Sequence, residues 1–220
     1  MTTKFQVLLS LRDVVLQDAG GARTEPFSLD IHEAERLHMQ CARDGWRDRL
    51  VQVVSGQTKP AQGSLLEVVP VLVQSDANLR ATLDLNRSLA DYLHSEDAPE
   101  FVWLEQRRRS LQVLVDLLGI APADTRRPLK LQSAQTVTRY WVLRFLLSRA
   151  QLLIGSEIFR LDDAQIRAAM ARRWPDLPGA VLVCAPREAL PGPVDTTLHL
   201  DADGTARIER QDAAPSTAEA

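Results

Sequence analysis

The amino-acid sequence predicts an α/β fold with a mainly parallel core sheet, an antiparallel β part at the N-terminus and a helical insertion in the middle. Strand patterns alternate with helical patterns on both sides of the middle third, an order typical of a parallel sheet covered by helices. Two strand patterns near the N-terminus flank a glycine-containing turn, which favours a hairpin. Over about 79–148, apolar residues recur at helical spacing instead.

The N-terminal third contains three predicted strands and one predicted helix. Strand patterns cover 5–16, 27–31 and 35–40, with a turn over 18–22. The third of these runs is apolar enough to be buried, and it leads into a loop at Cys41. Apolar residues at helical spacing predict a helix over 48–55, which ends near Gly56. Strand, loop, helix and turn thus follow one another as in a phosphate-binding strand–loop–helix unit.

The rest of the chain is predicted to hold one more strand, the helical insertion and a second alternating section. A run rich in β-branched residues predicts a buried strand over 65–73, and helical spacing predicts helices over 79–93 and 101–118. The last section is predicted as helix 137–148, strand 151–154, helix 162–173, strand 180–184 and a hairpin of 196–201 with 205–209. We expect 1–210 to form a single domain and 211–220 to be a disordered tail.

Composition excludes several classes of function. A chain of 220 residues, 45% of them hydrophobic, suits one domain with a substantial core. A net charge of -3 and a pI near 5.8 disfavour nucleic acid as a partner. No run reaches the roughly twenty apolar residues of a membrane span, and no signal-peptide cleavage pattern follows the start. The two cysteines make no disulfide framework, so we expect a reduced compartment. The cysteines and histidines lack metal-ligand spacing, so we expect no metal site.

Residues 41–49 keep the frame of a phosphate-binding loop without its chemistry. Such a loop needs glycines for close approach of backbone N–H groups to phosphate, a lysine for charge and a hydroxyl for Mg²⁺. The frame is occupied by Cys41, Ala42, Arg43, Asp44, Gly45, Trp46, Arg47, Asp48 and Arg49. We interpret Trp46 as a bulky indole where backbone should approach phosphate, and Asp48 as a carboxylate beside the phosphates. Weak anion binding by Arg43, Arg47 and Arg49 stays open as an alternative.

Motifs in the same order along residues 5–210 resemble those of the ATPase subunit of ABC transporters. The frame at 41–49 resembles the Walker A motif of that family, and Gln74 resembles its Q-loop glutamine. The signature motif is matched by Ser133, Ala134 and Gln135. Glu157 follows a leucine-rich strand, as the general base of the Walker B motif does. The resemblance implies the ABC-type P-loop nucleotide-binding domain.

The departures from the family pattern fall on the residues that carry its catalysis. In the Walker A frame the flanking glycines, the lysine and both hydroxyls are replaced. In the Walker B frame Ser156 stands where a metal-binding aspartate is expected, which leaves Glu157 as the one candidate catalytic residue. The signature has lost its glycine pair, and no histidine follows the strand at 181–183, where the H-loop histidine belongs.

The resemblance, with these departures, implies a degenerate ATP-binding-cassette subunit of an ABC-type transport complex. This subunit is a pseudo-ATPase without a cofactor, acting as a structural or regulatory partner of a membrane permease. The resemblance also implies a cytoplasmic location at the inner face of the membrane. It further implies either a homodimer or a heterodimer with an intact ABC ATPase. The alternative is a divergent but functional ABC transporter ATPase that binds Mg²⁺-ATP and uses Glu157 to hydrolyse it. A third interpretation is a soluble adaptor that contacts no permease.

Overall fold

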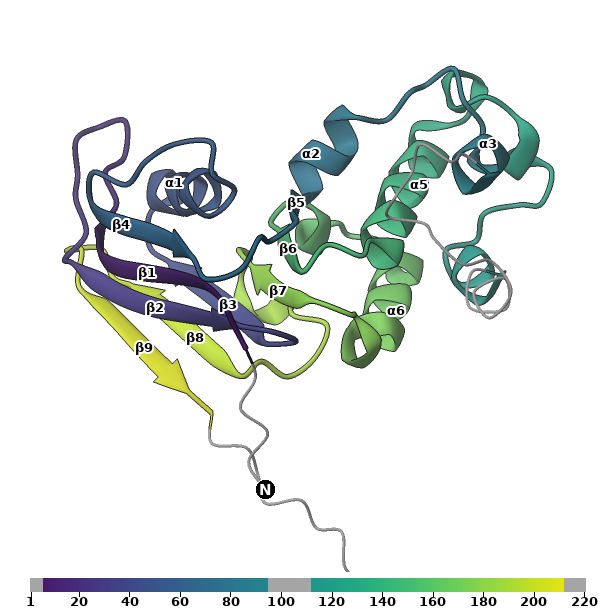
Figure 1. Ribbon diagram of the computed structural model, residues 1–220. Coiled ribbons are helices and arrows are strands. Elements are labelled where there is room, and N and C mark those ends of the chain that lie inside the picture. The colour runs from purple at the N-terminus through teal and green to yellow at the C-terminus, as the bar shows by residue number, and fades with distance from the viewer. Residues whose placement is uncertain (1–5, 95–111, 212–220) are drawn as a thin grey trace, which may run out of the picture.

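The computed structural model describes residues 6–94 and 112–211 (Figure 1). Most of the predicted helix over 101–118 and the tail at 212–220 lie outside the described residues. Within them, an antiparallel sheet lies at one end of the molecule and a group of helices at the other, with a mainly parallel sheet between (Figure 1). This arrangement confirms the predicted fold class.

The N-terminal β part is a three-stranded antiparallel sheet. Its strands are β1 (Val7–Val15), β2 (Phe27–His32) and β4 (Gln62–Glu67), in the order β2-β1-β4. The predicted turn before β2 forms, because the Asp18 carboxylate accepts a hydrogen bond of 2.9 Å from the Ala22 N–H and Gly21 adopts a φ of 83°. The apolar side chains of β2 alternate toward one face, which is buried, whereas β1 is buried over most of its length.

The central sheet has six strands and carries the edge at which the candidate site lies. Its strands are β3 (Arg36–Cys41), β5 (Val73–Ser75), β6 (Leu152–Gly155), β7 (Ala180–Val183), β8 (Thr196–Leu200) and β9 (Ala206–Arg210). The order is β5-β6-β7-β3-β8-β9, and every pairing is parallel except the hairpin of β8 with β9. The strands predicted over 35–40, 151–154 and 180–184 and the predicted hairpin are therefore confirmed.

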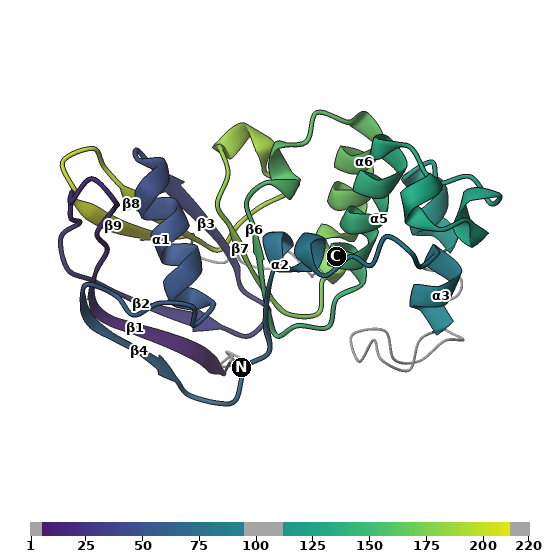
Figure 2. The ribbon, with the colours of Figure 1, turned by 90° about the horizontal axis from the view of Figure 1, so that it is seen from above.

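One helix fills the space between the two sheets. The helix α1 (Asp44–Val54) buries Trp46, Leu50, Val53 and Val54. These side chains share a core with residues of β1 and β2 and with Met39 and Leu198 of the central sheet. Figure 2 shows α1 beside the strands of the N-terminal half, at a distance from the other helices. The position of α1 is thus set by apolar packing on two sides.

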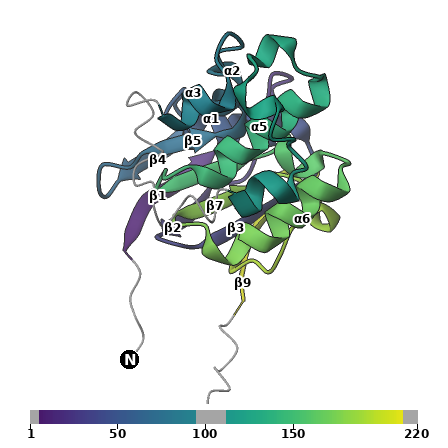
Figure 3. The ribbon, with the colours of Figure 1, turned by 90° about the vertical axis from the view of Figure 1, so that its right-hand side faces the viewer.

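The remaining helices lie on the other side of the central sheet (Figure 3), where residues of α5 and α6 share a core with Leu153, Val181 and Val183. They are α2 (Asp76–Ala81), α3 (Leu89–His94), α5 (Ala134–Leu147) and α6 (Ala164–Arg173), with a helical stretch at 112–117. Short 3₁₀ turns are η2 (Asp124–Arg126), η3 (Leu129–Leu131), η4 (Ile158–Arg160), η5 (Trp174–Asp176) and η6 (Arg187–Ala189). Residues 140–147 of α5 are buried all round, so this helix is the centre of the second core. We call the described residues of 82–147 the helical part.

Three sequence predictions about element boundaries are wrong. The strand predicted over 65–73 is two strands, because β4 pairs with β1 as an exposed edge and β5 begins at Val73 in the other sheet. The helix predicted over 79–93 is interrupted: the Asp84 carboxylate accepts from the Asn86 N–H, and Ser88 and Asp91 cap the next helix. The helix predicted to start at residue 48 starts at Asp44.

Among residues 6–94 and 112–211, no helix is long and apolar enough to cross a membrane.

Candidate functional site

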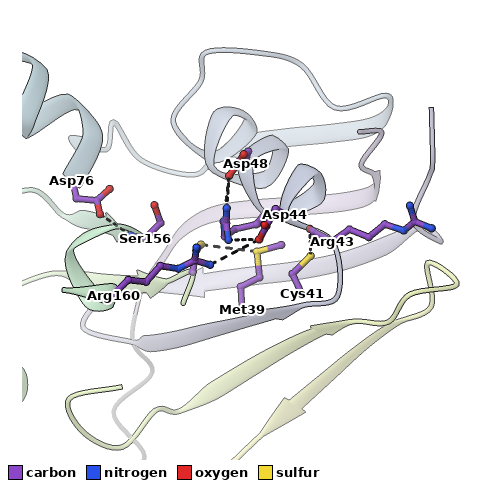
Figure 4. Close-up of polar contacts among 10 residues, drawn as sticks. Met39, Cys41, Arg43, Asp44, Asp48, Asp76, Ser156 and Arg160 are labelled. Atoms are coloured by element: carbon purple, nitrogen blue, oxygen red, sulfur yellow. Dashed lines mark hydrogen bonds and ion pairs between the residues drawn. The ribbon is translucent and has the colours of Figure 1, made fainter. Parts of the chain in front are cut away.

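The candidate site lies where β3, β6 and β7 end and α1 begins (Figure 4). In open α/β sheets, ligands bind outside the carboxyl ends of the strands. The residues predicted for a Walker A frame and for the end of a Walker B strand both lie at this edge. Arg160 of η4 comes within 3.9 Å of Asp44 of α1, which places the two segments next to each other.

The connection between β3 and α1 is very short. Only Ala42 and Arg43 lie between the last residue of β3 and the first of α1. The Ala42 N–H donates to the Leu200 carbonyl at 2.9 Å, which ties the connection to β8. A Cβ on Gly45 would lie 2.7 Å from the Asp18 Cβ, so the chain needs glycine where α1 passes the N-terminal turn. A phosphate-binding loop surrounds its anion with successive backbone N–H groups, and a two-residue connection has few to offer.

Arg47 is held by two carboxylates of its own helix. Its guanidinium lies 2.5 Å from Asp44 and 3.1 Å from Asp48, and its side chain is only 14% exposed. Asp44 is in the first turn of α1, where a negative charge is stabilised by the helix dipole. Figure 4 shows Asp44 and Asp48 along the start of α1, with Arg160 pointing toward Asp44. The cation that the resemblance places against phosphate therefore already has two anionic partners.

Trp46 is a core residue. Its side chain is 1% exposed, and its indole N–H donates to the Ala22 carbonyl at 3.0 Å. The Arg43 guanidinium lies 5.2 Å from the ring centroid on one side, an arrangement typical of a cation–π contact. The indole thus packs between α1 and the N-terminal turn, which corrects the interpretation that it obstructs the space in front of the loop.

The other two arginines of the frame point to separate partners. Arg43 lies 3.9 Å from Asp18 and donates to the Ala202 carbonyl. Arg49 donates to the Gln52 side chain and to the Lys59 carbonyl, near the far end of α1. The structure does not gather Arg43, Arg47 and Arg49 around one point, so the anion-binding alternative has no geometric support here.

The residues after β6 are engaged by the helix α2. The backbone N–H groups of Ser156 and Ile158 donate to Asp76 at 2.8 and 3.0 Å. Glu157 forms an ion pair of 2.9 Å with Arg80, and both side chains are more than half exposed. Asp76 is 1% exposed; burial raises the pKa of its carboxyl, while backbone hydrogen bonds from Ile158, Ser156 and Ala77 oppose that change. Asp76 was not predicted from the sequence, although a carboxylate two positions after Gln74 was a signal.

The side chains of Gln74 and of the signature residues 133–135 form hydrogen bonds with residues away from the candidate site. Gln74 lies inside β5, and its side-chain carbonyl accepts from the Ser148 hydroxyl at 2.6 Å. Ser133 caps α5 by accepting from the Thr136 N–H. Ala134 begins α5, and Gln135 donates to Asp163 at 3.3 Å. These predicted site residues thus support the helical part and its contact with α6.

The cysteines and the buried histidine of this edge are packing residues. Burial raises the pKa of both thiols, and the Cys184 sulfur lies 3.9 Å from that of Met39. His38 is 1% exposed and bonds the Ala185 carbonyl at 2.8 Å; burial lowers the pKa of its imidazole. Across residues 6–94 and 112–211, no group of three His, Cys, Asp or Glu side chains is arranged to hold a metal ion.

The element order, the two sheets and the helical part define the fold of ABC transporter ATPase domains, as the resemblance implied. A metal-chelate type ABC transporter in an inward-facing conformation is similar at a TM-score of 0.65 and 14% identity, over 93% of this chain and 84% of that one. CbiO1 from Clostridium perfringens, part of the ABC transporter complex cbiONQ, is similar at 0.63 and 14% identity, over 91% and 87%. No family model and no curated protein sequence matches the chain.

The same fold occurs in structures outside transport complexes. The archaeal ribosome recycling factor aABCE1, solved with the ribosomal stalk protein aP1, is similar at a TM-score of 0.70 and 17% identity. The match covers 94% of this chain but 40% of that one. At these identities the likeness establishes the fold of this chain, and its function has to be argued from its own residues.

Proposed function

We propose that the protein is a degenerate ATP-binding-cassette subunit of an ABC-type transport complex, in which it serves as a non-catalytic structural or regulatory partner of a membrane permease. The observation that carries this proposal is the Arg47 guanidinium held between Asp44 and Asp48 directly after a two-residue connection. The chain supplies its own anions at the start of α1, where a helix would otherwise attract a phosphate.

The electrostatics of the site oppose a nucleotide. A phosphate placed at the start of α1 has to displace Arg47 from its carboxylates and then lie beside them. Each contact between like unit charges at about 4 Å costs about 1 kcal/mol in water and about 4 kcal/mol at the effective dielectric of a protein surface. Asp44 is 79% exposed, so the value near the lower limit applies to it. The residues present do not fit a triphosphate.

The residues after β6 do not fit Mg²⁺ either. A divalent cation in a nucleotide site is bound by carboxylates together with the phosphates. Ser156 offers a neutral hydroxyl, and Asp76 uses its carboxylate on the backbone of Ser156 and Ile158. No step of ATP hydrolysis is therefore assigned to these residues, and the proposed subunit has no cofactor.

A membrane permease is the partner that the fold favours. CbiO1, which shares this fold, is part of the ABC transporter complex cbiONQ. Binding to a permease places the protein at the cytoplasmic, inner face of the membrane, beside a second copy or an intact ABC ATPase. An adaptor away from the membrane is the outcome if no such complex forms.

The second candidate function is a divergent ABC ATPase. One observation favours it: Glu157 lies two residues after β6, and its exposed ion pair with Arg80 is of a kind that contributes little energy. Glu157 is thus available to act as a base if a nucleotide binds nearby. In that case ATP and Mg²⁺ are the cofactors.

Phosphate release from Mg²⁺-ATP separates the two functions. We expect the purified protein to release phosphate at the rate of a buffer blank, because its own carboxylates occupy the site. We expect Glu157→Gln to leave this rate unchanged. We expect the same of Glu188→Gln, a control at an exposed glutamate of η6. A Mg²⁺-dependent rate that Glu157→Gln abolishes and Glu188→Gln preserves would establish the divergent enzyme instead.

A further inference from the structure

We propose that α2 is a fixed joint that holds the helical part against the central sheet in one orientation without any ligand, with Asp76 at its centre. This inference goes beyond the proposed function and stands on different residues. It concerns how the two halves of the fold are connected, whether or not a nucleotide binds at α1.

Asp76 joins two segments that are far apart in sequence. It is the first residue of α2, and one of its carboxylate oxygens accepts from both the Ser156 and the Ile158 N–H. The other oxygen accepts from the Ala77 N–H at 2.8 Å. A buried carboxylate is costly unless several donors surround it, and charge-assisted hydrogen bonds are the strong ones. The bonds to Asp76 thus fix the start of α2 to the end of β6.

Arg80 and Trp141 close this contact into a network. Arg80 is one turn after Asp76 on α2, and it pairs with Glu157 of the same segment after β6. Its guanidinium also lies 5.2 Å from the centroid of the Trp141 ring. The Trp141 indole N–H in turn donates to the Asp76 carbonyl at 2.7 Å. The helix α2 is therefore bonded to the segment after β6 through Asp76 and Arg80, and to α5 through Arg80 and its backbone.

The end of α2 and the strand before it, β5, are also bonded to α5 or to the residue that follows it. The buried Arg144 donates to the Leu79 carbonyl at 2.8 Å, which satisfies a carbonyl in the last turn of α2. At the other end the Ser148 hydroxyl donates to Gln74 of β5. A helix as short as Asp76–Ala81 is not stable alone, so these contacts determine where it lies.

The network makes movement of the helical part unfavourable. Any rotation of the helical part relative to the central sheet breaks either the bonds from Asp76 to the segment after β6 or the bonds from Trp141 and Arg144 to α2. A hinge normally consists of a few exposed residues that absorb a change of backbone angles. Asp76 is buried instead, and both of its carboxylate oxygens accept hydrogen bonds. This connection therefore has the properties of a rigid joint and not of a hinge.

Distances between spin labels on the two halves test the joint. We would place one label at Leu131→Cys, which is 58% exposed in the helical part, and one at Ala202→Cys, exposed in the turn after β8. Cys41→Ser removes the half-buried thiol, and the buried Cys184 is protected from labelling. Without nucleotide, we expect a single narrow distance distribution in this parent protein.

Asp76→Asn is expected to broaden that distribution or to add a second distance, because an amide cannot accept all three N–H groups. Asp162→Asn, the same change at a 95% exposed carboxylate, is expected to leave it narrow. Trp141→Phe keeps an aromatic ring but removes the donor to the Asp76 carbonyl, so it is expected to broaden the distribution as well and serves if the Asn variant fails to fold. A broad distribution in the parent, or narrow ones in both folded variants, would overturn the joint. Because no nucleotide is present, neither result depends on the proposed function.

Discussion

Trp46→Ala is expected to lower the free energy of unfolding by about 3–5 kcal/mol, the usual cost of removing a buried tryptophan. The side chain is 1% exposed and lies in the core shared by α1 and both sheets. Trp46→Gly, which restores the residue of the Walker A pattern, adds about 1 kcal/mol because glycine weakens a helix interior. A change toward the nucleotide-binding pattern thus damages this fold.

Urea denaturation of the variants measures this effect. Trp46→Phe keeps an aromatic ring while losing the bond to the Ala22 carbonyl, so it should fall between the parent and Trp46→Ala. Leu131→Ala removes an exposed side chain and should change stability by less than about 0.5 kcal/mol. If Trp46→Gly kept the stability of the parent protein and bound nucleotide, the indole would be an obstruction and not part of the core.

Arg36→Met is expected to lower the free energy of unfolding by roughly 3–5 kcal/mol, because each buried carbonyl left without its donor costs about 1–3 kcal/mol. The Arg36 side chain is buried at the start of β3 and lies 5.6 Å from the Trp174 ring centroid. Its guanidinium donates to the carbonyl oxygens of Ala34, Trp174, Leu177 and Gly179. Desolvation lowers the pKa of Arg36, and the nearby Asp195 carboxylate partly offsets this.

Thermal and urea unfolding of two variants and one control check this role. Arg36→Lys keeps the charge but presents a single ammonium instead of a planar fork, so it should lose most of the same stability. Arg12→Met removes a 48% exposed arginine paired with Asp30 and should cost less than about 1 kcal/mol. Equal stability of Arg36→Lys and the parent would mean that charge alone, and not the geometry of the fork, holds this corner.

Sequence patterns predicted the central sheet well because its strands are buried on both faces. Runs such as Leu152–Gly155 and Ala180–Val183 are continuously apolar and have no other stable place in a protein of this size. The break at 82–88 was missed because apolar spacing continues across it while local side-chain bonds end the first helix. The strand at 62–67 was misplaced because half-exposed apolar residues there resemble a buried run.

Sequence patterns singled out residues 41–49 but did not predict how their side chains are arranged. The start of α1 depends on the close passage of Gly45 by Asp18 and on the burial of Trp46, neither of which is visible in local sequence. Once the helix begins at Asp44, the pairing of Arg47 with Asp44 follows from the i,i+3 helical spacing, whereas the contact of Arg47 with the adjacent Asp48 does not. Asp76 was missed because its donors lie about eighty positions further along the chain.

Nucleotide binding is the property on which the proposed function depends most directly. The melting temperature of the purified protein, measured across a Mg²⁺-ATP titration into the millimolar range with Mg²⁺-free ATP as control, reports it. A ligand at a hundredfold excess over its dissociation constant adds about 2.7 kcal/mol of stability. We expect no change at any concentration, because Asp44, Arg47 and Asp48 already occupy the start of α1. A saturable, Mg²⁺-dependent rise would contradict this and establish a nucleotide site.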